Sequence, residues 1–371
     1  MKNKLLIILG TRPEIIKLSS FIKNSEKFFT NILVNTNQNY DTNLNKVFFK
    51  DLGIRRPKYL LKTNKNYSTN KKISFFITSI EKIIRKEKPD AAIYLGDTNT
   101  CYSLIPVKKF KIPIFHLEAG NRCYDERVPE EINRRFTDHI SDINLVYSNH
   151  SKANLLREGI DNYRIIQTGS PMMEVIYDNL KTINSSKILE DLKLLQRKFI
   201  LVSFHREENL DNNNIFSDFK IFLINLLKKY KTKIVISTHP RLYLKIRNQI
   251  KKNKNIIFHK PFCFSDYIKL QQNSLINLSD SGTLMEETSI LKTKSILLRE
   301  KHERPEGTDK GILITSKINS KDIFNKIDTI IKNKDQFDVP ESYMSKNFSE
   351  IVIKTIFSYK DYVNNFIWKK V

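Results

Sequence analysis

The chain has 371 residues, of which 40% are hydrophobic and 28% are charged, so it can bury a core but is long for a single domain. No apolar run approaches the ~20 residues of a membrane span, and the N-terminal segment lacks a signal peptide's cleavage site. We therefore expect a cytoplasmic protein without membrane insertion. Three scattered cysteines predict neither a disulfide framework nor a metal site.

The net charge of +24 raises the question of nucleic-acid binding. The lysines, however, are spread over predicted helical surfaces, as in Lys228-Lys229 and Lys251-Lys252, without interleaved aromatic residues. No known nucleic-acid-binding module is recognisable. Because charge alone does not define such a module, we expect no nucleic-acid partner.

Short apolar runs alternate along the chain with longer stretches of helical period, which is typical of parallel strands covered on both faces. The strands are expected at residues 4–9, 32–35, 91–95, 114–117, 143–146, 165–168, 199–203, 234–237, 256–259, 275–278 and 295–298. Gly169 and Pro171 interrupt this pattern. We therefore predict an α/β protein with two doubly wound, Rossmann-like domains at 1–169 and 170–350.

The C-terminal segment carries a helical stripe of apolar residues, which predicts a closing helix over 351–371 that packs back on the protein. The stripe consists of Val352, Ile356, Tyr359, Val363 and Phe366.

Polar residues follow the strands of the first half, where doubly wound folds bind their ligands. Arg12 and Lys17 lie near the start of the helix after the first strand, where anions are favoured, although Arg12 could equally be an exposed surface cation. A GxGxxG fingerprint is absent, so no bound dinucleotide is expected.

Carboxylates are concentrated after the third and fourth strands of that half. Asp97 is placed either to cap the next helix or to transfer protons. Glu118 has no obvious structural explanation at its strand end. Glu130 and Glu131 follow Pro129 in the first turn of a helix, which explains one of the two electrostatically. Asp97, Glu118 and Glu130 together suit an enzyme that moves protons.

The second half offers groups that suit a phosphate. His205 follows a strand, and residues 278–287 form a strand, a small-residue turn and a helix, with free N–H groups expected at Ser281 and Gly282. Glu287 is placed to reach ribose hydroxyls, and Arg304 adds a loop cation.

These segments resemble the non-hydrolysing UDP-N-acetylglucosamine 2-epimerases, in the same order and across residues 3 to 311. The matching segments are residues 10–14, 96–98, 116–120, 129–134, 205–207, 280–282 with 286–287, and 303–306. The resemblance implies a GT-B fold with the active site in a cleft between two Rossmann-like domains, and a homodimer.

The resemblance also implies roles for individual residues. The matches to catalytic residues are Asp97, Glu118, Glu130 and His205. The matches to residues around UDP are Arg12, Lys17, Arg134, Ser281, Gly282, Glu287 and Arg304.

The implied reaction inverts C2 of a UDP-N-acetyl-hexosamine by eliminating UDP to a 2-acetamidoglycal and adding it back. This route needs carboxylates near C2 and cations for the diphosphate, but no NAD and no metal. Short loop features, including Ser170-Pro171-Met172, look more like the branch that converts UDP-2-acetamido-2,6-dideoxy-L-talose to UDP-N-acetyl-L-fucosamine than like enzymes making UDP-ManNAc from UDP-GlcNAc.

Three alternatives remain open from the sequence: a hydrolysing epimerase that releases free ManNAc, a GT-B glycosyltransferase, and the nucleic-acid module considered above. Residues 38–41 read Gln-Asn-Tyr-Asp where the family carries a segment linked to activation by substrate, so such regulation is not expected. Both candidate products, UDP-N-acetyl-L-fucosamine and UDP-ManNAc, would serve a bacterial surface polysaccharide such as O-antigen or capsule.

Overall fold

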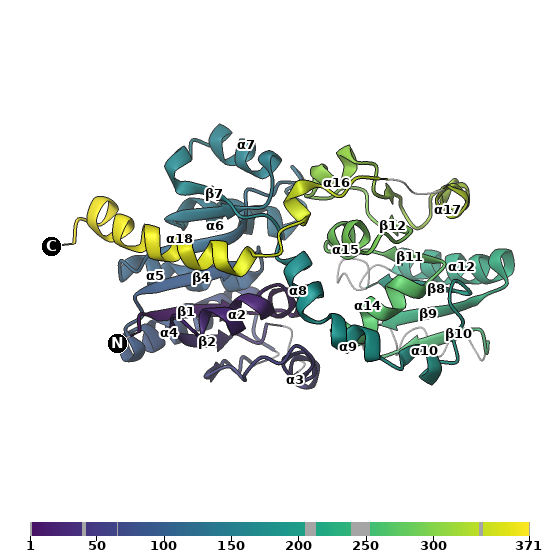
Figure 1. The fold of residues 1–371 in the computed structure, drawn as a ribbon, viewed down its shortest axis with the longest axis horizontal. Coiled ribbons are helices and arrows are strands. Elements are labelled where there is room, and N and C mark those ends of the chain that lie inside the picture. The colour runs from purple at the N-terminus through teal and green to yellow at the C-terminus, as the bar shows by residue number, and fades with distance from the viewer. Residues whose placement is uncertain are drawn as a thin grey trace. The chain divides into compact units, whose positions relative to one another are not determined.

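A computed structural model describes residues 2–38, 42–64, 66–204, 213–238, 253–333 and 337–370. The chain divides into two compact units (Figure 1). Unit 1 comprises Met1–Asp178 together with Glu341–Val371, and unit 2 comprises Asn179–Pro340. Each unit is built on its own parallel sheet.

Unit 1 has a seven-stranded sheet in the order β3-β2-β1-β4-β5-β6-β7, in which every pair is parallel. Its strands are β1 (Lys4–Leu9), β2 (Thr30–Asn35), β3 (Tyr59–Leu60), β4 (Ala91–Leu95), β5 (Ile114–Ala119), β6 (Ile143–Val146) and β7 (Ile165–Gln167). Its α-helices are α1 (Arg12–Lys17), α2 (Ser19–Ser25), α3 (Thr42–Asp51), α4 (Thr69–Glu87), α5 (Leu104–Lys109), α6 (Pro129–Ile140), α7 (Asn149–Arg157), α8 (Met172–Asp178) and α18 (Phe348–Tyr362).

Helix α4 shows how the sequence produces these layers. Ser68 caps its first turn by accepting a hydrogen bond from the Lys71 N–H at 3.3 Å. The apolar residues Phe76, Ile80 and Ile84 recur on one face at helical spacing and are buried in the core beneath β1 and β4. The helix ends at Lys88, which adopts a left-handed conformation.

The strand order of unit 1 reverses between β1 and β4, because β2 follows β1 on one side and β4 lies on the other. In doubly wound sheets a ligand crevice opens outside the carboxyl ends of the strands at such a switch point. The loops that begin at Gly10 and Gly96 therefore flank the expected site. Gly10 is required there, since a Cβ atom would overlap the hydroxyl of Thr100.

Unit 2 repeats the arrangement with a six-stranded parallel sheet in the order β10-β9-β8-β11-β12-β13. Its strands are β8 (Phe199–Phe204), β9 (Lys233–Thr238), β10 (Ile256–His259), β11 (Ile276–Ser279), β12 (Ser295–Leu297) and β13 (Ile314–Thr315). Its described helices are α9 (Leu180–Ser185), α10 (Ile188–Asp191), α12 (Asn213–Tyr230), α14 (Phe264–Asn273), α15 (Leu284–Leu291), α16 (Pro305–Asp309) and α17 (Ile323–Lys332). Here the switch point lies between β8 and β11.

The C-terminal helix α18 packs on unit 1 against α2, as the yellow helix in Figure 1 shows. The ring of Phe357 stacks on Phe29 with centroids 4.8 Å apart. The N–H of Ser349, at the start of the helix, donates to Glu174 of α8 at 3.0 Å. The apolar stripe ends before Phe366, which is 70% exposed although the sequence pattern placed it on the packed face.

The limits of the compact units differ from the domain limits 1–169, 170–350 and 351–371 that the sequence predicts. The N–H of Ser170 donates to the Ser342 carbonyl at 2.7 Å, and Ser20 of α2 donates to Asp178 at 2.6 Å. These bonds fasten α8 and the segment from Glu341 onward to unit 1.

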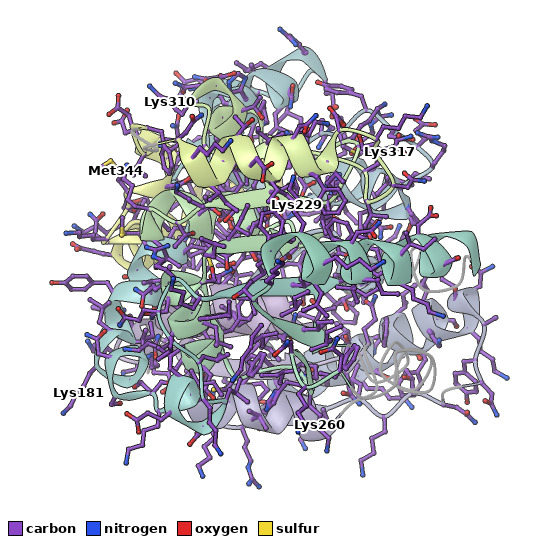
Figure 2. The ribbon with its side chains drawn as sticks, turned by 90° about the vertical axis from the view of Figure 1, so that its right-hand side faces the viewer. Lys181, Lys229, Lys260, Lys310, Lys317 and Met344 are labelled. Atoms are coloured by element: carbon purple, nitrogen blue, oxygen red, sulfur yellow. The ribbon has the colours of Figure 1, made fainter. Side chains whose placement is uncertain are left out.

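Lysines are spread over several elements of unit 2. Figure 2 labels five lysines that come from separate elements of that unit. They are Lys181 of α9, Lys229 of α12, Lys260 after β10, Lys310 after α16 and Lys317 after β13. Within the described ranges, no helix combines the length and the apolar character needed to cross a membrane.

Candidate functional site

Glu118 lies at the carboxyl end of β5 in an unusual backbone conformation. Its φ angle is +67°, and the register between β5 and β6 shifts between Leu117 and Ala119, as in a β-bulge. The Lys17 ammonium contacts both carboxylate oxygens, at 2.9 and 3.0 Å. Lys17 itself is 2% exposed and lies 5.5 Å from the centre of the Tyr147 ring. Glu118 therefore combines a left-handed backbone at the strand end with a direct contact to a buried cation.

Asp97 follows β4 and is paired in a similar way. The Nε and Nη2 atoms of Arg134 lie 2.8 and 2.7 Å from its Oδ2. Asn133 of the same helix, α6, donates to the Asp97 carbonyl at 2.8 Å. Thr98, not Asp97, stands at the N-cap of the short 3₁₀ helix that follows, so the alternative capping role for Asp97 is wrong.

The two adjacent glutamates at the start of α6 have different environments. Glu131 is fully buried and accepts from the Cys123 and Tyr124 N–H groups at 3.0 and 3.1 Å and from Arg134 at 2.7 Å. Burial raises the pKa of Glu131, but these donors outweigh it and hold that pKa below its usual value. In Glu130, the buried Oε2 atom has no hydrogen-bond partner among the described residues. Glu131 is therefore the structural member of the pair.

Arg12 and Glu14 shape the loop after β1. The guanidinium of Arg12 is half-buried and lies 5.6 Å from the centre of the Phe48 ring, so Arg12 is not an exposed surface cation. Glu14 is buried and accepts hydrogen bonds from the Gly10 N–H and from the Thr98 hydroxyl, the latter at 2.9 Å. Burial raises the pKa of Glu14 to about 7, although these hydrogen bonds oppose the shift. Glu14 thus joins the loops after β1 and β4.

In unit 2, the loop between β11 and α15 brings several predicted binding residues together. Ser281 and Gly282 precede Thr283, the N-cap of α15. The expected free N–H at Ser281 is wrong, because this group donates to the Ser279 hydroxyl at 3.0 Å. Glu287 is buried and accepts from Gln271 at 2.7 Å.

Arg304 lies against this loop within a set of opposite charges. Its Nε donates to Glu286 at 3.1 Å and its Nη1 donates to Glu303 at 2.5 Å. Glu303 also accepts from Arg299, whose Nε binds the Asp280 carbonyl at 2.6 Å. A Cβ atom at Gly282 would come within 2.9 Å of Glu303 and 3.1 Å of Arg304, so glycine lets the loop backbone approach this cluster.

Four of the predicted residues of unit 1 therefore form two pairs of opposite charge, Lys17 with Glu118 and Arg134 with Asp97, which spacing alone did not show. Lys17 and Arg134 are predicted to lie beside UDP, and in the structure each also contacts a proposed catalytic carboxylate. His205 lies outside the described residues, as do Asn39, Tyr40 and Asp41 of the segment linked to substrate activation. The described ranges contain no cluster of three or more His, Cys, Asp or Glu suited to a metal ion. The sequence reasoning gave no role to Glu14, Glu286 or Glu303, although all three stand in family-like segments.

Comparison with known proteins identifies the family. Residues 22–357 match the family described as UDP-N-acetylglucosamine 2-epimerase. The chain is 35% identical to the UDP-N-acetylglucosamine 2-epimerase of Methanocaldococcus jannaschii over 343 residues, which cover 89% of this chain and 93% of that protein. The chain belongs to the UDP-N-acetylglucosamine 2-epimerase family.

Solved structures agree with this assignment. The Rickettsia bellii UDP-N-acetylglucosamine 2-epimerase matches with a TM-score of 0.92 and 40% identity, covering all of both chains. The M. jannaschii enzyme in complex with UDP-GlcNAc and UDP matches with a TM-score of 0.89 and 33% identity, covering 96% of this chain and 99% of that one. The expected GT-B-like fold, with two parallel α/β sheets, is confirmed. Family membership places the chain among the isomerases that act as UDP-sugar 2-epimerases.

Proposed function

We propose that this epimerase inverts C2 of a UDP-N-acetyl-hexosamine by eliminating UDP and adding it back. In the first step a base removes the C2 proton while the bond between C1 and the UDP oxygen breaks, which leaves a 2-acetamidoglycal. In the second step UDP returns to C1 and a proton is delivered to the opposite face of C2. The C2 hydrogen lies beside no carbonyl, so a direct exchange of this proton would be far slower.

The observation that carries this proposal is the pairing of carboxylates with buried cations at the switch point of unit 1. A nearby cation favours the ionised form of Asp97 and of Glu118, and the ionised carboxylate is the form that can act as a base. Glu130 presents a carboxylate oxygen without a partner among the described residues, which suits a group that hydrogen-bonds to a ligand. We assign the C2 proton transfers to these three residues.

Unit 2 is proposed to hold the uridine diphosphate. The turn at Ser281 and Gly282 opens helix α15, whose N-terminus favours an anion, and Arg304 supplies positive charge beside it. Gln271 fixes the Glu287 carboxylate, which would then accept from ribose hydroxyls. Arg12 of unit 1 and His205 are proposed to steady the departing diphosphate.

UDP-GlcNAc is the first substrate to test, because the relatives described above carry it in their names or titles. UDP-2-acetamido-2,6-dideoxy-L-talose is the second substrate to test, because several loop features resemble the L-fucosamine-forming branch.

Incubation with each UDP-sugar in D2O, without added cofactor, tests the proposal. We expect deuterium at C2 of both epimers with one substrate and not with the other, measured by NMR. Recovery of unlabelled sugar with every substrate would contradict the mechanism. Release of free ManNAc in the same samples would instead indicate a hydrolysing epimerase, and turnover that requires an acceptor would indicate a glycosyltransferase.

The homodimer implied by the family resemblance stays a prediction, which light scattering checks.

A further inference from the structure

A buried polar cluster lies beneath the carboxylates of unit 1 and has no role in the proposed function. It consists of His116 of β5, Asp138 of α6 and Arg122 of the intervening loop. His116 and Asp138 are fully buried, and Arg122 is 3% exposed. Such groups are costly to bury unless each is fully hydrogen-bonded, so their partners indicate what they do.

His116 contacts one acceptor through each ring nitrogen. Its Nε2 lies 3.0 Å from the Gly96 carbonyl oxygen and its Nδ1 lies 2.8 Å from Asp138 Oδ1. A carbonyl oxygen can only accept, so Nε2 must carry a hydrogen. Asp138 already accepts from the Gly120 N–H at 3.2 Å and from Arg122 at 2.7 Å, as an ionised carboxylate does. Nδ1 therefore donates as well, and the ring is an imidazolium.

The charges around Asp138 support this protonation. Burial raises the pKa of Asp138, but the hydrogen bonds and charges of His116 and Arg122 outweigh it and hold that pKa below its usual value. Arg122 is balanced on its other side by Glu158, whose carboxylate accepts from Nε and Nη2 at 2.8 and 2.6 Å. Together with the partly exposed Glu158, the cluster thus pairs two cations with two carboxylates.

The cluster connects the two loops that carry proposed catalytic groups. Gly96 immediately precedes Asp97, and Gly120 follows Glu118 by two residues. Both loops contain left-handed conformations, with φ of +90° at Gly96, +67° at Glu118 and +77° at Gly120. Glycine adopts such angles freely, whereas at Glu118 they are strained and persist only where the surroundings fix them. A line of hydrogen bonds runs from Gly96 through His116 and Asp138 to Gly120 and so links the two loops.

We infer that His116 is a positioning residue that donates from both ring nitrogens and thereby holds the Asp97 and Glu118 loops at a fixed separation. The inference rests on the proposed function for its catalytic consequence, but not for the state of the ring. Two substitutions separate the two bonds: His116→Asn places an amide near the Nδ1 position, and His116→Gln places one near the Nε2 position. His116→Asn is expected to keep the bond to Asp138 and lose the bond to Gly96, and His116→Gln is expected to do the reverse.

The first readout is the ring itself, in the wild-type protein labelled with 15N-histidine. We expect one histidine with two exchange-protected ring N–H signals, both absent from His116→Gln and both retained in the control His150→Gln, which changes an exposed histidine of α7. A His116 ring with a single N–H would overturn the inference. This measurement needs no substrate, and the state of the ring is read from the wild-type protein, with the variants serving only to assign the signals.

The second readout is exchange of the C2 hydrogen in D2O. Misplaced catalytic groups lose rate but not ligand binding, so we expect both His116 variants to exchange about 10²-fold more slowly while the Kd for UDP stays within about twofold of wild type. A folded variant that binds UDP and exchanges at the wild-type rate would overturn the positioning role. If the wild type exchanges with no UDP-sugar, the proposed function fails, whereas the ring signals still decide the state of His116.

Discussion

The ammonium of Lys17 lies 2.9 Å from the carboxylate of Glu118, a residue 101 positions further along the chain. Lys17 is the last residue of α1 and Glu118 is the penultimate residue of β5, so the pair joins the two sides of the switch point in unit 1. A lysine that is 2% exposed needs such a partner, because an unpaired buried charge is strongly unfavourable. Lys17, which the family resemblance places beside UDP, therefore also holds the Glu118 carboxylate.

Lys17→Met removes this cation and leaves Glu118 with less compensation for its charge. We expect turnover to fall at least about 10²-fold and the stability of unit 1 to fall by about 2 kcal/mol, below the value for a fully buried pair since Glu118 is partly exposed. Thermal unfolding and the exchange assay measure both effects. The double variant Lys17→Met/Glu118→Gln should regain the lost stability without regaining activity. Additive losses of stability would contradict the pairing.

Asp97→Asn keeps the shape of the side chain but removes its ability to take a proton. If Asp97 acts as a base or acid, turnover should fall by about 10²–10⁴-fold. UDP affinity, measured by calorimetry, should change little. Near-normal turnover would refute the assignment of Asp97.

Glu130→Gln and Glu131→Gln should separate activity from stability at adjacent positions. Glu131 is buried and holds the loop at Cys123 and Tyr124, so its amide variant loses acceptor capacity and should unfold at a clearly lower temperature. Glu130→Gln should retain the wild-type melting temperature and lose most of its turnover. Glu126→Gln, an exposed glutamate of the preceding loop, is the matched control. Equal activity in Glu130→Gln and in the Glu126→Gln control would exclude Glu130 from the chemistry.

Glu14 should make stability depend on pH. Its pKa is about 7 in the folded protein and 4.5 when unperturbed, so the unfolded chain loses this proton at lower pH than the folded one. The contribution is fully present below about pH 4.5 and is lost as pH rises to about 7, amounting to roughly 3 kcal/mol. Relative to Glu14→Gln, which cannot ionise, the wild type should therefore become less stable across this interval. Parallel stability profiles from pH 4.5 to 8 would show that Glu14 does not titrate there.

Arg304→Lys tests the charge cluster beside the Gly282 turn. Lysine cannot bond Glu286 and Glu303 in the planar geometry of a guanidinium. We expect UDP affinity to fall about tenfold, the equivalent of one charge-assisted hydrogen bond of ~1.5 kcal/mol. Lys310→Met, which removes a surface charge of the same unit, should bind UDP normally. Calorimetric titration with UDP compares the two variants, and equal affinities would contradict a role for Arg304.

The sequence predicted the strands well, but it did not predict which charged side chains pair with each other. All described strands of three or more residues coincide with predicted apolar runs, because a strand buried on both faces carries little but apolar residues. The edge strands β3 and β13 were missed, since two residues are too few to form a pattern. The predicted carboxylates do lie at strand ends or at a helix start. That Lys17 pairs with Glu118, and Arg134 with Asp97, depends on tertiary contacts that local spacing does not encode.

The left-handed backbone at Glu118 has a consequence for how this position tolerates change. Glycine and asparagine adopt that conformation at lower cost than glutamate does. A library randomised at residue 118 and sorted for thermal resistance alone should therefore accumulate those two residues, while the same library sorted for epimerisation should return glutamate. At this one position, the demands of folding and of chemistry select different amino acids.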